Sequence, residues 1–244
     1  MSEIPETSDE TPDPLFIYLH GFASSPGSKK AQFFKDRLAV RGITLHIPDL
    51  NVPNFEHLTL STMIARTAEE AQSAPNAQIN LIGSSMGGLL ALHFADRHRE
   101  VHVSRLFLMA PAFDMYQNRR RTLGAEGMAA WKATGQLATY HYGSQQTRQL
   151  HHGLMDDMAA YDSFAVDLPQ PMVIYHGRND ASVDYHDSSK RTGDSASCTS
   201  FASASASSAP PTITDACTVP DSTQRASSTM RANARLRVRT VSAE

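Results

Sequence analysis

The chain has 244 residues and a formal net charge of −3, and one α/β domain of ordinary size fills this length. The charge balance provides no basic surface for nucleic acid, and no apolar run is long enough to cross a membrane. Residues 1–14 are acidic and proline-bearing, unlike a secretory signal. We therefore expect a disordered N-terminal segment followed by a cytoplasmic protein that binds neither nucleic acid nor membrane.

Between residues 15 and 190, short apolar runs alternate with helical patterns. The runs cover residues 15–20, 43–48, 79–83, 104–110 and 171–177, and helices are expected within 28–42, 58–72 and 87–98. Apolar runs of this length are typical of strands buried on both faces of a parallel sheet. The sequence therefore predicts a doubly wound α/β fold with helices on both faces, and residues 112–168 are expected to form a helical cap.

The stretch GSSMG at residues 83–87 fits the pattern G-x-S-x-G between a strand and a helix. A sharp turn in this position lifts the hydroxyl of Ser85 above the sheet, and the flanking glycines avoid collisions with the neighbouring strand and helix. The helix N-terminus directs amide hydrogens toward developing negative charge. Ser85 is therefore the candidate nucleophile.

Two further loops complete the candidate site. The strand that ends at His20-Gly21-Phe22 places a backbone amide, that of Phe22, opposite the amide of Met86, and two such donors form an oxyanion hole. His20 is expected to shape this loop rather than to act as a base. After the run at 171–177, Asp180 is the candidate triad acid and Asp184 the weaker alternative, because the expected chain order is Ser, acid, His.

The stretches YLHGFASSPGSKKA, LIGSSMGG and MAPAF together resemble the YqiA-like small bacterial esterases of the α/β-hydrolase superfamily. The resemblance covers about residues 15–187. It implies a carboxylic-ester hydrolase for short acyl esters, with Ser85 as nucleophile, Asp180 as acid, and Phe22 and Met86 as oxyanion donors. Members of this family carry the catalytic histidine in a loop after one further strand.

No histidine follows His186 in this sequence. His186 lies only six residues after Asp180 and cannot easily reach the serine, whereas His151 and His152 precede the acid and break the expected order. The sequence therefore predicts a serine esterase that is impaired because its base is absent.

The composition changes after Lys190. More than half of residues 191–244 are Ser, Ala or Thr, and none is His, Lys, Tyr or Trp. Both cysteines, Cys198 and Cys217, lie here, so the sequence indicates neither a metal site nor a cofactor. We expect a disordered, low-complexity tail and a sheet without its last strand, whose 171–177 edge is uncovered.

Two explanations of the tail are open. It is a genuine flexible tail, or the coding sequence slipped frame near codon 190. When the codons of residues 211–218 are read from their third base, they can encode a histidine-containing Asp-x-His loop of the kind that the family carries.

Alternative functions are also open. A thioesterase or an acyltransferase would use the same serine and oxyanion hole, and a catalytically dead hydrolase fold would serve as a binding protein. Each of the catalytic alternatives would act on a small-molecule ester or thioester as its partner.

Overall fold

A computed structural model of the chain describes residues 13–192, 199–200 and 240–242. Within these residues a parallel sheet has the strand order β2-β1-β3-β4-β7-β9-β8. The strands are β1 (Leu15–Leu19), β2 (Leu45–His46), β3 (Ile79–Ser84), β4 (Val103–Met109), β7 (Met172–Tyr175), β8 (Thr199–Ser200) and β9 (Thr240–Ser242). Each of the five predicted apolar runs overlaps one of the first five of these strands, so the predicted α/β sheet is confirmed.

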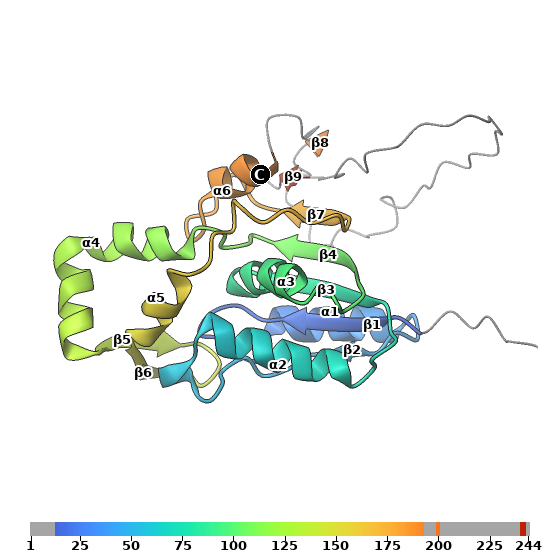
Figure 1. Cartoon of the computed structure of the whole chain (residues 1–244), viewed down its shortest axis with the longest axis horizontal. Helices are drawn as coiled ribbons and strands as arrows, with labels where there is room; N and C mark the ends of the chain where they lie inside the picture. The colour runs from blue at the N-terminus through green and yellow to red at the C-terminus, as the bar shows by residue number, and fades with distance from the viewer. Residues whose placement is uncertain (1–12, 193–198, 201–239, 243–244) are drawn as a thin grey trace, which may run out of the picture.

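Helices pack on both faces of the sheet (Figure 1). The helices around the central strands are α1 (Lys29–Ala39), α2 (Leu60–Gln72), α3 (Met86–Arg97) and α6 (Tyr185–Thr192). Alternate side chains of β1 enter opposite cores: Ile17 packs in the large core with α2 and α3, whereas Tyr18 packs with the α1 side. In the described part of the chain, no helix combines the length and apolar character that a membrane span needs.

The segment predicted as a helical cap contains both helices and a hairpin. It comprises α4 (Met115–Thr134), the antiparallel strands β5 (Gln136–His141) and β6 (Gln146–His151), and α5 (Gly153–Met158). The hairpin differs from the all-helical expectation because Gly135, at a φ of 71°, ends α4 and redirects the chain.

An ion pair helps to attach the hairpin to the core. Arg148 donates two hydrogen bonds to Glu56, at 2.6 Å from Nε and 2.8 Å from Nη2, and Glu56 belongs to the short 3₁₀ helix η1 (Phe55–His57). A bidentate pair of this kind fixes orientation as well as distance. The cap is therefore positioned relative to the loops that follow β2.

The far edge of the sheet differs from the expectation. Thr240–Ser242 form β9, which pairs with β7 at Ile174 and Tyr175, and β8 pairs with β9 in turn. The free N–H and C=O groups of an edge strand favour such pairing. The first two residues of the predicted disordered tail, Arg191 and Thr192, belong to α6. Apart from these residues and the two strands, that tail lies outside the described residues, as do residues 1–12 of the N-terminal segment.

The contact between α3 and the end of β1 is very close. A Cβ atom built on Gly87 would lie 2.0 Å from the carbonyl oxygen of Leu19, and one built on Gly83 would lie 2.5 Å from the carbonyl oxygen of Gly87. Both neighbours are backbone atoms, which cannot move aside without displacing a strand or a helix. The glycines thus set the distance between the sheet and the helix that begins after Ser85.

We predict that Gly87→Ala lowers the free energy of unfolding by about 3 kcal/mol or more, because the added methyl group forces α3 away from β1. Chemical denaturation monitored by circular dichroism measures this change. The control is Gly27→Ala, where the nearest atom to the new Cβ is 3.8 Å away, and its expected change is within about 0.5 kcal/mol. Equal effects of the two substitutions would show that the close contact does not limit the fold.

Candidate active site

Ser85 occupies a strained turn between β3 and α3. Its φ and ψ angles are 53° and −118°, a region that residues with a side chain rarely adopt. Backbone hydrogen bonds hold this conformation: the amide of Ser85 donates to the carbonyl of Met109 at 2.9 Å, and its carbonyl accepts from the amides of Gly88 at 2.9 Å, Ala112 at 3.1 Å and Leu89 at 3.3 Å. The turn is therefore fixed from two neighbouring segments, as the sequence motif predicted.

The loop after β1 lies against this turn. β1 and β3 are neighbours, with Leu19 opposite Gly83, and a Cβ atom on Gly21 would lie 3.4 Å from the Cβ of Ser85. Met86 is the first residue of α3, so its amide has no acceptor within the helix. Among the described residues, the amides of Phe22 and Met86 donate to no other group. Both amides therefore have no acceptor in this part of the chain.

His20 stabilises the same loop. Its ring is 1% exposed; Nδ1 donates to the carbonyl of Gly21 at 3.0 Å, and Nε2 accepts from the amide of Leu50 at 3.1 Å. Both ring nitrogens are thus occupied by backbone groups. This arrangement agrees with a loop-shaping role and leaves neither nitrogen for the hydroxyl of Ser85.

The adjacent serine, Ser84, has a different environment. Its hydroxyl accepts a hydrogen bond from Nζ of Lys30 at 3.1 Å and is also bonded to Tyr18. Burial raises the pKa of the Tyr18 phenol to about 12, so this hydroxyl stays protonated. Ser84 therefore connects the turn to Lys30 and Tyr18, a role that the sequence analysis did not assign.

The loop after β7 reaches the same region, but the carboxylate of Asp180 is bonded to its own loop. Oδ1 accepts from the amides of Ser182 at 2.8 Å and Val183 at 3.0 Å, and Oδ2 lies 3.9 Å from Nε2 of His176. His176 is fully buried, donates from Nε2 to the carbonyl of Val183 at 3.1 Å and is bonded through Nδ1 to Ser188. Asp180 thus shapes the turn that carries the next residues to Ser85.

The weaker candidate acid, Asp184, is at the start of α6. Its Oδ1 accepts from the amide of His186 at 2.9 Å, a bond that lowers the pKa of the carboxyl, and it contacts the imidazole of His186 at 2.9 Å. The side chain of His186 is 88% exposed. These groups form an exposed helix start rather than a catalytic pair.

His151 and His152 also lie elsewhere. The ring of His151 packs on His57, with centroids 5.3 Å apart, and His152 packs edge-on against Trp131. No histidine in the described residues lines the cavity beside Ser85. Within the same residues, no cluster of His, Cys, Asp and Glu could hold a metal ion.

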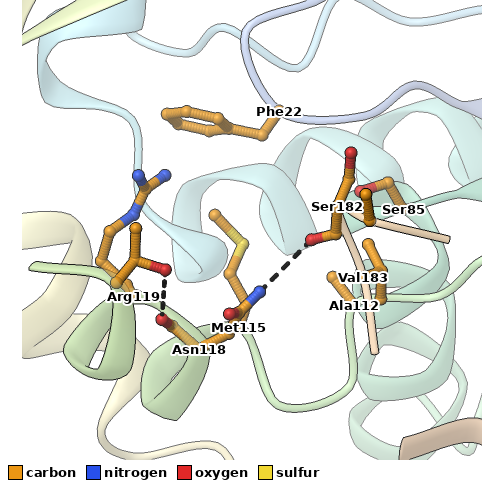
Figure 2. Close-up of a pocket in the computed structure, with 10 residues that line it drawn as sticks. Phe22, Ser85, Ala112, Met115, Asn118, Arg119, Ser182 and Val183 are labelled. Carbon is orange, nitrogen blue, oxygen red and sulfur yellow. Dashed lines mark hydrogen bonds between the residues drawn. The ribbon is translucent and has the colours of Figure 1, made fainter. Parts of the chain in front are cut away.

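A cavity of about 360 Å³ opens beside Ser85 (Figure 2). Its walls come from four loops and one helix; they are Phe22, Ser85, Ala112, Met115, Asn118, Arg119, Thr122, Ala181, Ser182 and Val183. The helical residues Met115, Asn118, Arg119 and Thr122 have the spacing i, i+3, i+4, i+7, so they share one face of α4. The sequence analysis did not identify this face, because its four residues share no chemical character that would mark a site.

Comparison with known proteins shows the family and the fold. The chain matches the uncharacterised protein family UPF0227 over residues 15–200. A comparison with curated proteins finds no match.

Solved structures with the same fold include several hydrolases. A protein from Agrobacterium vitis described as a hydrolase is 25% identical, with a TM-score of 0.65 and 73% of each chain covered. Est1E from Butyrivibrio proteoclasticus, in a structure with bound ferulic acid, is 22% identical, with a TM-score of 0.60 and 78% of each chain covered. Mouse alpha/beta hydrolase domain-containing protein 10 is 19% identical, with a TM-score of 0.61 and coverage of 73% of this chain and 74% of that one. The chain therefore has the α/β-hydrolase fold and belongs to UPF0227, the family of the YqiA-like esterases that its motifs resemble.

Proposed function

We propose that the chain is a serine hydrolase of short-chain carboxylic esters that forms an acyl-enzyme on Ser85 and is impaired because a triad histidine is absent. The observation that carries the proposal is the strained turn at Ser85, which faces a cavity and adjoins two free backbone amides. The cytoplasmic location expected from the composition is part of the same proposal.

In this mechanism the oxygen of Ser85 attacks the ester carbonyl. The oxyanion that forms accepts hydrogen bonds from the amides of Phe22 and Met86, which are fixed before the substrate arrives. Collapse of the intermediate releases the alcohol, and water then attacks the acyl-serine and releases the acid. An imidazole oriented by Asp180 would accept the serine proton at the start and return it to the alcohol.

The impairment follows from the absence of that imidazole. In the described residues no histidine lines the cavity, and the carboxylate of Asp180 binds amides of its own loop. The same observations favour a second candidate function, a catalytically dead hydrolase fold that binds small molecules. A thioesterase or acyltransferase would need the same missing base.

A frameshift in the C-terminal tail would explain why the triad histidine is absent. The family match ends at residue 200, shortly after the change in composition at Lys190. Residues 211–218, whose codons can encode the missing loop in another frame, lie outside the described residues.

We predict that the chain hydrolyses 4-nitrophenyl butyrate at only about 10³ to 10⁴ times the rate in water, which an oxyanion hole alone can supply. Steady-state release of 4-nitrophenol measures the rate. Ser85→Ala should abolish any acyl-enzyme detected by mass spectrometry, whereas Ser73→Ala, at an exposed serine at the end of α2, is the control and should retain it. Turnover of about 10 per second that depends on Ser85 would show that another base operates.

We predict that Phe22 acts through its backbone amide. Phe22→Pro deletes the amide hydrogen and should lower the residual rate about a hundredfold, whereas Phe22→Leu preserves the amide and should retain most of the rate. The assay is the same ester hydrolysis, with folding of both variants checked by circular dichroism. Equal losses in the two variants would place the oxyanion donor elsewhere.

We predict that the nucleotide sequence of codons 185–244 encodes a strand and an Asp-x-His loop in an alternative frame. A single-base correction near codon 190 should then raise ester turnover by several orders of magnitude, because the restored imidazole activates Ser85. Sequencing is the first measurement. If codons 211–214, read from their third base, encode no histidine, the tail is genuine and the binding-protein function becomes the favoured one.

A further inference from the structure

One charged side chain lines the cavity beside Ser85. Arg119 extends from the first half of α4, and its guanidinium lies over the ring of Phe22, with 5.4 Å between the guanidinium carbon and the ring centroid (Figure 2). Phe22 is also the residue whose amide we place in the oxyanion hole. The cation therefore lies at the wall of the cavity that Ser85 also lines.

Arg119 has no ion pair within the described residues. Its pKa is lowered by burial alone, with no carboxylate contributing. The two arginines that follow it differ: Arg121 pairs with Asp114 at 3.2 Å, and Arg120 lies over the ring of Tyr116. A half-buried guanidinium without an anion is unfavourable, and its donors remain available to a ligand.

The other polar side chains of the helical face are already bonded. Nδ2 of Asn118 donates to the carbonyl of Ser182 at 3.4 Å, and the hydroxyl of Thr122 donates to the carbonyl of Asn118 at 2.9 Å. Figure 2 shows the bond between Asn118 and Ser182 at the cavity wall. Among the residues that line this cavity, Arg119 is thus the cation that can select a substrate.

We propose that the cavity binds esters that carry a carboxylate, and that Arg119 is the residue that recognises this group. The inference rests on the proposed ester hydrolysis and names its substrate class. The planar fork of a guanidinium matches a carboxylate through two parallel hydrogen bonds. A single cation also balances a singly charged carboxylate, whereas a doubly charged phosphate would keep one charge unmatched.

The carboxylate could belong to the acyl part or to the alcohol part of the ester, and two isomers separate these sources. Monomethyl glutarate carries the carboxylate on the acyl part, and 4-acetoxybutanoate carries it on the alcohol part. Dimethyl glutarate is the neutral reference. Because turnover in this chain is expected to be slow, the affinities can be measured by calorimetry and ligand-observed NMR before hydrolysis interferes.

We predict that at least one of the two anionic esters binds the full chain about tenfold or more tightly than dimethyl glutarate. Arg119→Met should remove this preference, and Arg119→Lys, which keeps the charge but not the fork, should retain part of it. Arg120→Met is the matched control, since it removes an equal charge from the neighbouring position outside this cavity, and it should bind like the unmodified chain. Thermal melts establish that each variant is folded.

Two outcomes would overturn the inference: equal affinity for anionic and neutral esters in the unmodified chain, or equal losses in Arg119→Met and Arg120→Met. Ser85→Ala separates this inference from the proposed function, because the carboxylate should bind without the nucleophile. Carboxylate binding without any hydrolysis would contradict only the proposed hydrolysis. Hydrolysis through Ser85 without a preference for charge would contradict only the role of Arg119.

Discussion

The close contact between the backbone of α3 and the end of β1 is the constraint on which the candidate site depends. Because Gly87 has no side chain, α3 can begin next to the carbonyl of Leu19. Ser85, the residue before the first residue of α3, makes the turn into the helix with a positive φ. The same contact brings the loop after β1 against the serine. Under the proposed function, this one packing distance would position both the nucleophile and the oxyanion donors.

Elements with a strong local signal were predictable from the sequence. The strands around β3 are short apolar runs, and the glycines around Ser85 mark the sharp turn, so both were identified correctly. The hairpin of β5 and β6 was missed because its strands are polar and largely exposed, and because its attachment through Arg148 and Glu56 joins residues far apart in the chain. Such long-range contacts leave no periodic pattern in the sequence.

The same distinction applies within the site. The positions of Ser85, Phe22 and Met86 follow from the order of parallel strands, since the carboxyl ends of β1 and β3 meet at one edge of the sheet. The cavity wall from α4 does not follow from that order, because it depends on where the helix runs after the loop that follows β4. Gly124, with a φ of 67° and a ψ of 177°, breaks α4 into two parts, and the first part carries the face with Arg119. Figure 1 shows this bend as a change in direction of α4.

The carboxylate of Asp180, the candidate triad acid, also has a structural role. In the structure it accepts two amide hydrogens from its own loop, and this loop in turn forms part of the cavity wall beside Ser85. An acid held in this way has a structural role even where no imidazole is present to orient. The scaffold around the serine therefore does not require the histidine for its geometry: the turn, the amides and the cavity are held by α3, β1 and α4. Under the proposed function, binding of an ester and stabilisation of an oxyanion depend on those elements, whereas proton transfer depends on an imidazole, so the absence of that base would separate recognition from turnover.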